Sequence, residues 1–204
     1  MYRGDGLNLY AYCGNNPVMY VDPSGYGSDK CGQQNSSQYP PRTKEAREEA
    51  QKVAKAMDDA KISKKQNQSV TVILHKDGTV SVGMSGKSGD QRMQTQVSKL
   101  QNELGENYKV SADSMPTDNI KKRANEPGIC SEPKAINAAH ENPSEIVGYD
   151  TVWRGKGENP HPFTGENVGG NIKSKKYEQM DPCGTCKDPE NIKEYMDYAN
   201  ANKQ

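Results

Sequence analysis

The chain has 204 residues, of which 31% are hydrophobic, with one tryptophan and one phenylalanine. This length suits one domain, or one domain with an appendage, and this composition allows only a small hydrophobic core. Basic and acidic side chains balance at 27 each, which excludes the strong overall field that draws a protein to nucleic acid or membrane. No apolar run approaches the roughly 20 residues of a membrane helix, so we expect no membrane segment.

The N-terminal stretch, residues 1–26, is rich in tyrosine and ends in a Pro/Gly turn. Residues 4–12 and the Pro-x4-Asp-Pro-x-Gly pattern from Pro17 to Gly25 resemble the end of the Rhs repeat core. That family encloses a variable C-terminal toxin and cleaves itself at this pattern. The resemblance implies a toxin domain downstream, delivered by a bacterium into the cytoplasm of a target cell, and a cognate immunity protein. An ordinary β-hairpin is the alternative interpretation.

Residues 27–42 contain mainly Gly, Ser, Gln, Asn and Pro without hydrophobic periodicity. This composition is typical of a flexible linker. We therefore expect the folded domain at residues 43–204. Cys13 and Cys31 lie outside it, and we expect both to be free thiols.

Hydrophobic spacing predicts the elements of this domain in order. A helix is expected over residues 43–62, then a hairpin of alternating valines around Asp77-Gly78, which is a strong turn signal. A second helix follows from Met93 to Leu104, with a weak strand over residues 108–112. A helix that opens at Cys130, a strand over residues 146–153 and a last helix opened by a C-x-x-C complete the pattern.

Two short motifs carry the chemistry: Cys-Ser-Glu-Pro at residues 130–133 and Pro-Cys-Gly-Thr-Cys at residues 182–186. A C-x-x-C turn can direct two thiolates to one tetrahedral zinc ion, and a third sulfur from Cys130 leaves one coordination position open for water. Glu132 lies two residues beyond Cys130, near enough to reach that water. Zinc lowers the pKa of a bound water towards 7, and the carboxylate would move its proton.

These motifs resemble the zinc deaminase signature, with Cys130 in place of the usual histidine. The resemblance implies an α/β, cytidine-deaminase-like fold: a mixed β-sheet flanked by helices, with the zinc site at the N-termini of two helices. It implies Zn²⁺ as cofactor, ligated by Cys130, Cys183 and Cys186, and Glu132 as the catalytic proton shuttle.

The resemblance also implies a substrate. Among the deaminases of bacterial polymorphic toxins, a Cys-Ser-Glu-Pro motif is similar to a branch that deaminates cytosine in DNA. Single-stranded DNA is favoured, because a stacked base must first be extruded. RNA, free nucleosides or nucleotides, and adenine as the base remain alternatives.

The chain departs from the family near its end. The stretch from Glu132 to Cys183 is longer than one strand and its turns require, and few residues follow Cys186. The strands that usually follow the C-x-x-C helix have no room. We expect residues 155–180 to complete the sheet or to form a loop over the pocket.

Other interpretations of the cysteines stay open. A structural zinc site would need a fourth ligand, which His140 or His161 could supply. A disulfide between Cys183 and Cys186 would explain only those two residues. The corresponding alternative function is a zinc-stabilised interaction module without turnover.

Side chains near the motifs are candidates for substrate binding. Basic residues flank the motifs, as expected for contact with a phosphate backbone. Trp153 ends the strand over residues 146–153 and could stack on an exposed base, with core packing as the alternative. The candidate contacts are Trp153, Ser85, Gly86, Asn125, Arg123 and Arg154.

Overall fold

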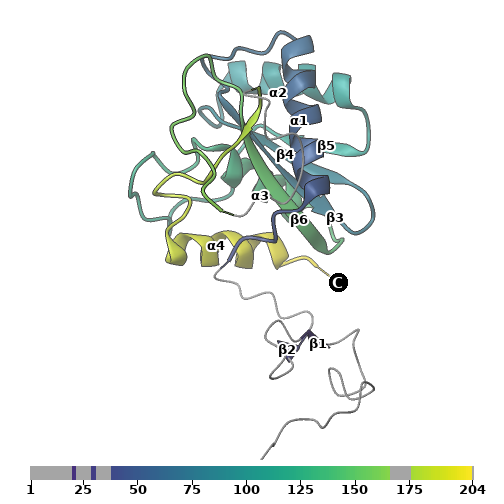
Figure 1. The fold of residues 1–204 in the computed structure, drawn as a ribbon, viewed down its shortest axis with the longest axis vertical. Coiled ribbons are helices and arrows are strands. Elements are labelled where there is room, and N and C mark those ends of the chain that lie inside the picture. The colour runs from purple at the N-terminus through teal and green to yellow at the C-terminus, as the bar shows by residue number, and fades with distance from the viewer. Residues whose placement is uncertain (1–19, 22–28, 31–37, 166–175, 204) are drawn as a thin grey trace, which may run out of the picture. The chain divides into compact units, whose positions relative to one another are not determined.

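The structure is a computed structural model that describes residues 20–21, 29–30, 38–165 and 176–203 (Figure 1). The chain separates into two units, residues 1–35 and 36–204. In the first unit, β1 (Tyr20–Val21) pairs antiparallel with β2 (Asp29–Lys30). The rest of the Rhs-like stretch, most of the expected linker, and Cys13 and Cys31 lie outside the described residues.

The second unit combines helices with a mixed sheet. Its described helices are α1 (Lys44–Asp59), α2 (Gln91–Leu104), α3 (Ser131–His140) and α4 (Pro189–Asn200). Its strands are β3 (Ser69–His75), β4 (Val80–Met84), β5 (Tyr108–Ser111), β6 (Ile146–Trp153) and β7 (Glu178–Gln179).

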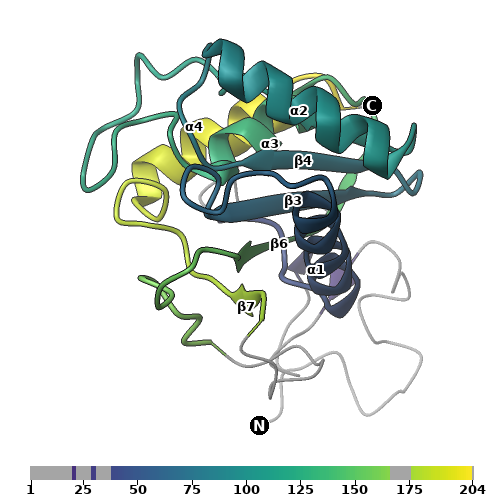
Figure 2. The same cartoon turned by 90° about the horizontal axis from the view of Figure 1, so that it is seen from above.

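The strand order in this sheet is β5-β4-β3-β6-β7, with β4 and β5 parallel and the other neighbours antiparallel. Figure 2 shows β4, β3, β6 and β7 in this order. The expected α/β class, a mixed sheet flanked by helices, is therefore confirmed. Residues 178–179 of the expected 155–180 segment do extend the sheet, but only as the two-residue edge strand β7. None of the helices in the described parts of the chain is long and apolar enough to span a membrane.

Local sequence explains where three of the helices and one hairpin turn form. Thr43, Asp90 and Asp188 cap α1, α2 and α4 by accepting backbone N–H groups with their side chains. The β3–β4 turn forms as expected: the Asp77 carboxylate accepts the Thr79 N–H at 2.9 Å, and Gly78 adopts a φ of +84°.

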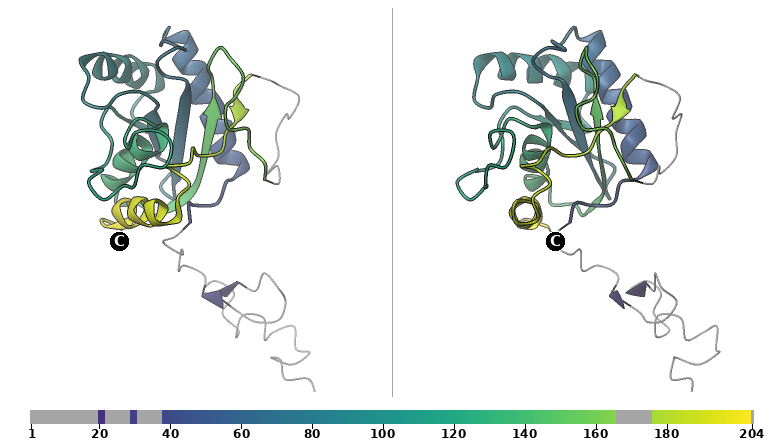
Figure 3. Two further views of the ribbon diagram at one scale, coloured as in Figure 1. Left: turned by 90° about the vertical axis from the view of Figure 1, so that its left-hand side faces the viewer. Right: turned by 60° about the vertical axis from the view of Figure 1, so that its left-hand side comes forward.

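Two hydrophobic clusters lie on the sheet. Helices α1 and α2 pack in one cluster with Val70, Val72 and Val82, while α3 and α4 pack in the other with Ile73 and Tyr149. Side chains alternate between the two faces of a strand, which explains how neighbours such as Val72 and Ile73 serve different clusters. Figure 3 shows α1 on one side of the sheet and α3 with α4 on the other.

Helix α3 lies unusually close to β4 because the strand carries Gly83 at the contact. A Cβ atom on Gly83 would come within 2.1 Å of the Ser131 carbonyl oxygen and 2.3 Å of the Ala135 nitrogen. Only a residue without a side chain therefore allows the first turn of α3 to rest on the strand.

Residues 39–42, which we call the strap, belong to the folded unit and not to a linker. Pro41 accepts the backbone N–H of Tyr149 at 3.1 Å, and Arg42 forms a parallel bridge with Tyr149. The Arg42 guanidinium forms an ion pair with Asp150, whose side chain is completely enclosed. The domain boundary expected at residue 43 is thus too late.

Candidate metal centre

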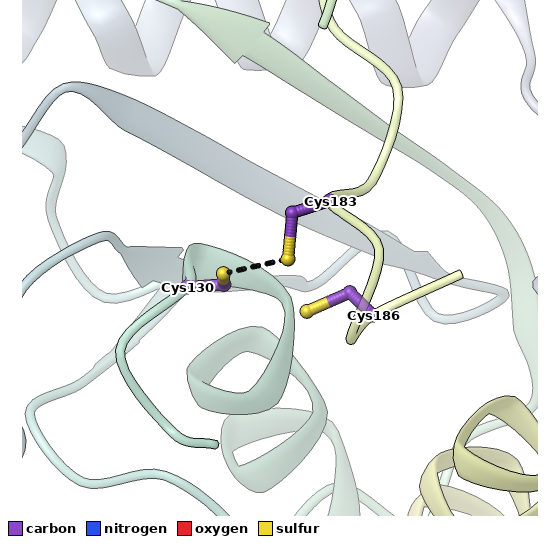
Figure 4. Close-up of side chains that lie close together, drawn as sticks. All are labelled: Cys130, Cys183 and Cys186. Atoms are coloured by element: carbon purple, nitrogen blue, oxygen red, sulfur yellow. Dashed lines mark hydrogen bonds between the residues drawn. The ribbon is translucent and has the colours of Figure 1, made fainter. Parts of the chain in front are cut away.

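Three cysteine side chains meet at the start of α3 (Figure 4). Their sulfur atoms all lie within 4.8 Å of one another, and the sulfurs of Cys130 and Cys183 are 3.4 Å apart. All three thiols are free and buried, so the expected alternative of a Cys183–Cys186 disulfide is not present. A tetrahedral ion with Zn–S bonds of about 2.3 Å would hold its sulfurs about 3.8 Å apart. The donor set and spacing therefore fit a metal ion such as zinc.

Cys130 is the N-cap residue of α3. Its backbone is extended, and no side chain caps this helix. Because the Cys130 side chain does not cap the helix, its sulfur is available to the other cysteines and lies 3.4 Å from that of Cys183. The sulfur also accepts a hydrogen bond from the Asn125 side-chain amide at 3.3 Å. Free N–H groups in the first helical turn favour negative charge at this position.

Cys183 and Cys186 lie in a turn between β7 and α4, closed by a hydrogen bond from the Lys187 N–H to the Cys183 carbonyl. This turn does not itself open the last helix, which was the expectation. Asp188 caps α4 and Pro189 begins it, because proline suits the first helical position and lacks the N–H that would otherwise be unpaired. Only α3 therefore contributes a helix N-terminus directly to the cluster.

Thr185 fastens the C-x-x-C turn to the loop that precedes Cys130. Its hydroxyl accepts the N–H groups of Arg123 and Ala124 at 3.0 and 2.9 Å, and it donates to the Asn125 carbonyl at 2.8 Å. Asn191 adds bonds to the Lys121 backbone from α4. These local contacts bring together two motifs that are distant in sequence.

Glu132 is the second residue of α3 and is buried, with 3% of the residue exposed, and it interacts electrostatically with Cys183. Burial raises the pKa of Glu132 to about 7, and the neighbouring Cys183 acts in the same direction. Hydrogen bonds from Cys130 and Cys186 lower the pKa of the Cys183 thiol well below its usual value. One thiolate is therefore favoured before a metal binds, and metal binding would release the other thiol protons.

Lys134 is a site residue that the sequence analysis missed. Its side chain is fully buried, and its ammonium group donates to the carbonyls of Gly86, Gly128, Ile129 and Cys130 at 2.6–3.3 Å. Burial lowers the pKa of Lys134 to about 8, so the group is still mainly protonated at neutral pH. The Lys134 ammonium thus ties the turn after β4, at Gly86, to the backbone of residues 128–130, which leads into α3. No local pattern pointed to Lys134, because α3 also contains the polar residues Glu132, Asn137 and His140.

The strap also reaches the cysteines. The Tyr39 hydroxyl donates to the Cys186 carbonyl at 3.0 Å, and its ring stacks on Tyr149 with centroids 4.8 Å apart. Arg42 donates to the Met180 carbonyl at 2.7 Å, three residues before Cys183. The strap therefore holds the C-x-x-C segment at both ends.

Two of the expected substrate-binding arginines are engaged within the protein. Arg154 is 3% exposed and donates to Asp58 and to the carbonyls of Asn67 and Ile62. Its side chain presents no surface to a phosphate, so its role in this fold is structural. Arg123 is half exposed at the rim of the site and donates to the α4 cap Asp188 at 2.7 Å.

The other expected contacts lie at the same end of the sheet as the cysteines. Gly86 donates its N–H to the Ile129 carbonyl, next to Cys130, while the Ser85 hydroxyl accepts the Ser69 N–H. Asn125 contacts the Cys130 sulfur, as described above. Trp153 is partly exposed, and its indole N–H donates to the Gly157 carbonyl at 3.0 Å.

Neither histidine proposed as a fourth ligand joins the cysteines. The His140 ring stacks on Tyr198, and the group that could hold a metal ion among the described residues contains neither His140 nor His161. The Cys3His interpretation of the motifs therefore has no support in this fold.

Comparisons with protein families, with characterised proteins and with solved structures find no match to this chain. Its function has to be argued from the site itself.

Proposed function

We propose that this chain is a zinc-dependent hydrolytic deaminase that converts cytosine to uracil in DNA, with single strands favoured. One observation carries the proposal: three sulfurs converge at the N-terminus of α3, and the second residue of this helix, Glu132, is buried and interacts electrostatically with Cys183. A structural zinc site normally has four protein ligands, whereas three leave a position for a reacting water. We further propose that the α/β architecture is a cytidine-deaminase-like fold, since the order helix, hairpin, Cys-x-Glu helix, strand and C-x-x-C agrees with it.

Glu132 is the residue that would move protons. Cytosine deamination forms a bond from a water oxygen to C4, breaks the bond from C4 to the exocyclic nitrogen and releases ammonia. Glu132 would accept the water proton, donate it to ring N3 and later deliver a proton to the leaving nitrogen. A buried carboxyl at this position suits a group that must both accept and donate a proton during the reaction.

The other residues would hold the reacting groups in place. Cys130, Cys183 and Cys186 would ligate zinc, which when bound supplies a Lewis acid that lowers the pKa of a water ligand. Asn125 and Lys134 fix the Cys130 loop, and the strap fixes the C-x-x-C turn.

The proposed biological setting is that of a toxin. Residues 1–26 resemble the Rhs core, so we propose that the domain is delivered into a target cell and acts in its cytoplasm. A cognate immunity protein would then block the site in the producing cell. Co-purification of a neighbouring gene product, with loss of deamination on binding, tests this part.

The reaction is tested on the zinc-loaded full chain with single- and double-stranded cytosine oligonucleotides, read by sequencing. Glu132→Gln should retain zinc and lose at least about 100-fold in rate, since general acid–base catalysis contributes that much or more. Glu141→Gln is the matched control, because it changes an exposed glutamate at the other end of α3.

Three outcomes contradict the proposal as stated. Conversion of RNA or free cytidine alone would replace the substrate. Equal rates for Glu132→Gln and the wild type would remove Glu132 from the mechanism. No conversion of any substrate, with X-ray absorption showing four protein ligands on zinc, would favour a non-catalytic, zinc-stabilised interaction module.

A further inference from the structure

A cavity of about 860 Å³ lies where β6 ends, beside β7. Its lining combines two aromatic rings with three lysines: Trp153, Tyr177, Lys64, Lys156 and Lys176. The cavity contains none of the cysteines and lies outside the candidate metal centre. Its volume is in the range of small-molecule and nucleotide sites.

Trp153 lines this cavity and lies beside a strand residue that contacts α3. It pairs across the sheet with Ser69, whose hydroxyl lies 3.1 Å from that of Ser131, the residue after Cys130. Side chains two apart on a strand share a face, and Thr151 contacts Thr71 on the α3 face. Trp153 therefore lies on the face of the sheet that carries the cysteines.

The indole ring of Trp153 is held in one orientation. Its N–H donates to the Gly157 carbonyl, and a Cβ atom on Gly155 would come within 2.2 Å of the ring. The backbone of residues 155–157 thus fixes the ring, while part of the side chain stays exposed. A fixed, partly exposed indole is a suitable surface for a stacked base.

The cavity also has an excess of positive charge. Asp58 is the single carboxylate among three cations, paired with Lys64 and Arg154 at 2.7 Å and with Lys176 at 3.8 Å. This cluster leaves two positive charges in excess, and exposed Lys156 adds a third. Glu158 and Glu178 in the lining offset two of the three. One positive charge is then left in excess, and the exposed ammonium of Lys156 is suited to a phosphodiester anion.

We propose that this cavity binds the nucleotide next to the target base of a single-stranded polynucleotide, with its base on Trp153 and its phosphate among Lys64, Lys156 and Lys176. The position of this nucleotide rests on the proposed function, because the target base would occupy the metal centre on the other side of Trp153. We infer a single-stranded polynucleotide because aromatic rings can stack on bases while lysines contact the phosphate backbone, and neither contact depends on the sequence.

The test uses the full-length, zinc-loaded chain and a 12-nucleotide oligothymidylate, which contains no cytosine and so cannot be deaminated. Trp153 is the only tryptophan, so its intrinsic fluorescence reports on this cavity alone. We expect the oligothymidylate to quench this fluorescence over the same concentration range in which fluorescence anisotropy shows binding. An oligouridylate of equal length distinguishes DNA from RNA.

Two variants and a control locate the binding. Trp153→Leu should weaken binding about 5- to 100-fold, the range for loss of one stacked base. Lys156→Gln, an exposed change that leaves the fold intact, should lower the slope of log affinity against log salt by about 0.7. Lys99→Gln, which removes an exposed lysine on α2, should change neither quantity.

Binding without quenching, or equal affinities for the wild type and Lys156→Gln, would overturn the proposal. So would the absence of binding to both oligonucleotides at low salt. Quenching by oligothymidylate without deamination of any cytosine substrate would support the cavity and refute the proposed reaction. Deamination with a KM unaffected by both variants would refute the cavity alone.

Discussion

Arg42→Met tests whether the strap is part of the folded domain. The Arg42 guanidinium is 11% exposed and pairs with the Asp150 carboxylate, which is completely enclosed. Breaking a buried pair by removing one partner costs about 3–5 kcal/mol, because the other charge stays buried. Asp150 would keep hydrogen bonds from Gln179 and from the Thr151 N–H, both at 2.8 Å. We therefore expect the low end of that range, about 3 kcal/mol.

The loss should depend on pH. Burial raises the pKa of Asp150, and Arg42 acts against this rise. Removing Arg42 would raise the pKa of the folded state further above its unfolded value. A carboxyl with a raised folded-state pKa destabilises the fold increasingly as the pH rises from its unfolded pKa to its folded-state pKa, and by a constant amount above both. The cost of Arg42→Met should therefore be larger at pH 8 than at pH 5.

The assay is urea unfolding of the full-length, metal-free chain, followed by circular dichroism. Arg42→Met is measured alone and with Asp150→Asn, because a double-mutant cycle isolates the pair. We expect a coupling energy of about 2 kcal/mol. Arg42→Lys keeps the charge but loses the planar fork, and should recover only part of the stability. A cost below about 1 kcal/mol, equal in both backgrounds, would refute the reasoning.

Three further predictions concern packing, protonation and the metal. Gly83→Ala should lower the free energy of unfolding, measured in urea, by about 3 kcal/mol, since its Cβ would overlap α3. In the control Gly157→Ala the Cβ meets open space, so the loss should be under about 0.5 kcal/mol. Equal losses would contradict the close contact between β4 and α3. Burial lowers the pKa of His75 below its unfolded value. The free energy of unfolding should therefore fall as the pH drops below about 6.5, by up to about 1.4 kcal/mol per pH unit. In His75→Asn, this pH dependence of the urea midpoint should disappear. Free zinc at 100 times its Kd should add about 2.7 kcal/mol to the free energy of unfolding, and Cys186→Ser should abolish most of this gain; an unchanged gain in the variant would place the metal elsewhere.

Much of the fold was accessible from local sequence pattern. The β3–β4 hairpin depends on Asp77 and Gly78 at the turn itself, and β6 coincides with the expected strand over residues 146–153. The cysteine cluster was also accessible, because zinc chemistry restricts residue type and spacing. In these cases the determining residues are close in sequence or chemically distinctive.

The rest depended on contacts between distant residues. The composition of residues 27–42 indicates a linker, but Arg42 finds its partner 108 residues away and Tyr39 finds Cys186 at a separation of 147. Arg154 looked like a surface cation because its partner Asp58 is 96 residues earlier. No local pattern records such pairs. Lys134 was missed for another reason, since its partners are backbone carbonyls, which have no sequence signature.

The contact between α3 and β4 has a consequence for engineering. Beneath Cys130 and Glu132 the helix touches the strand main chain to main chain, without side chains that could be exchanged for larger or smaller ones. Substitutions at this contact between α3 and β4 would displace Cys130 and Glu132 before they changed the shape of a binding pocket. A directed-evolution library aimed at altered selectivity should therefore be concentrated on the surrounding loops, at residues 121–128 and 154–162.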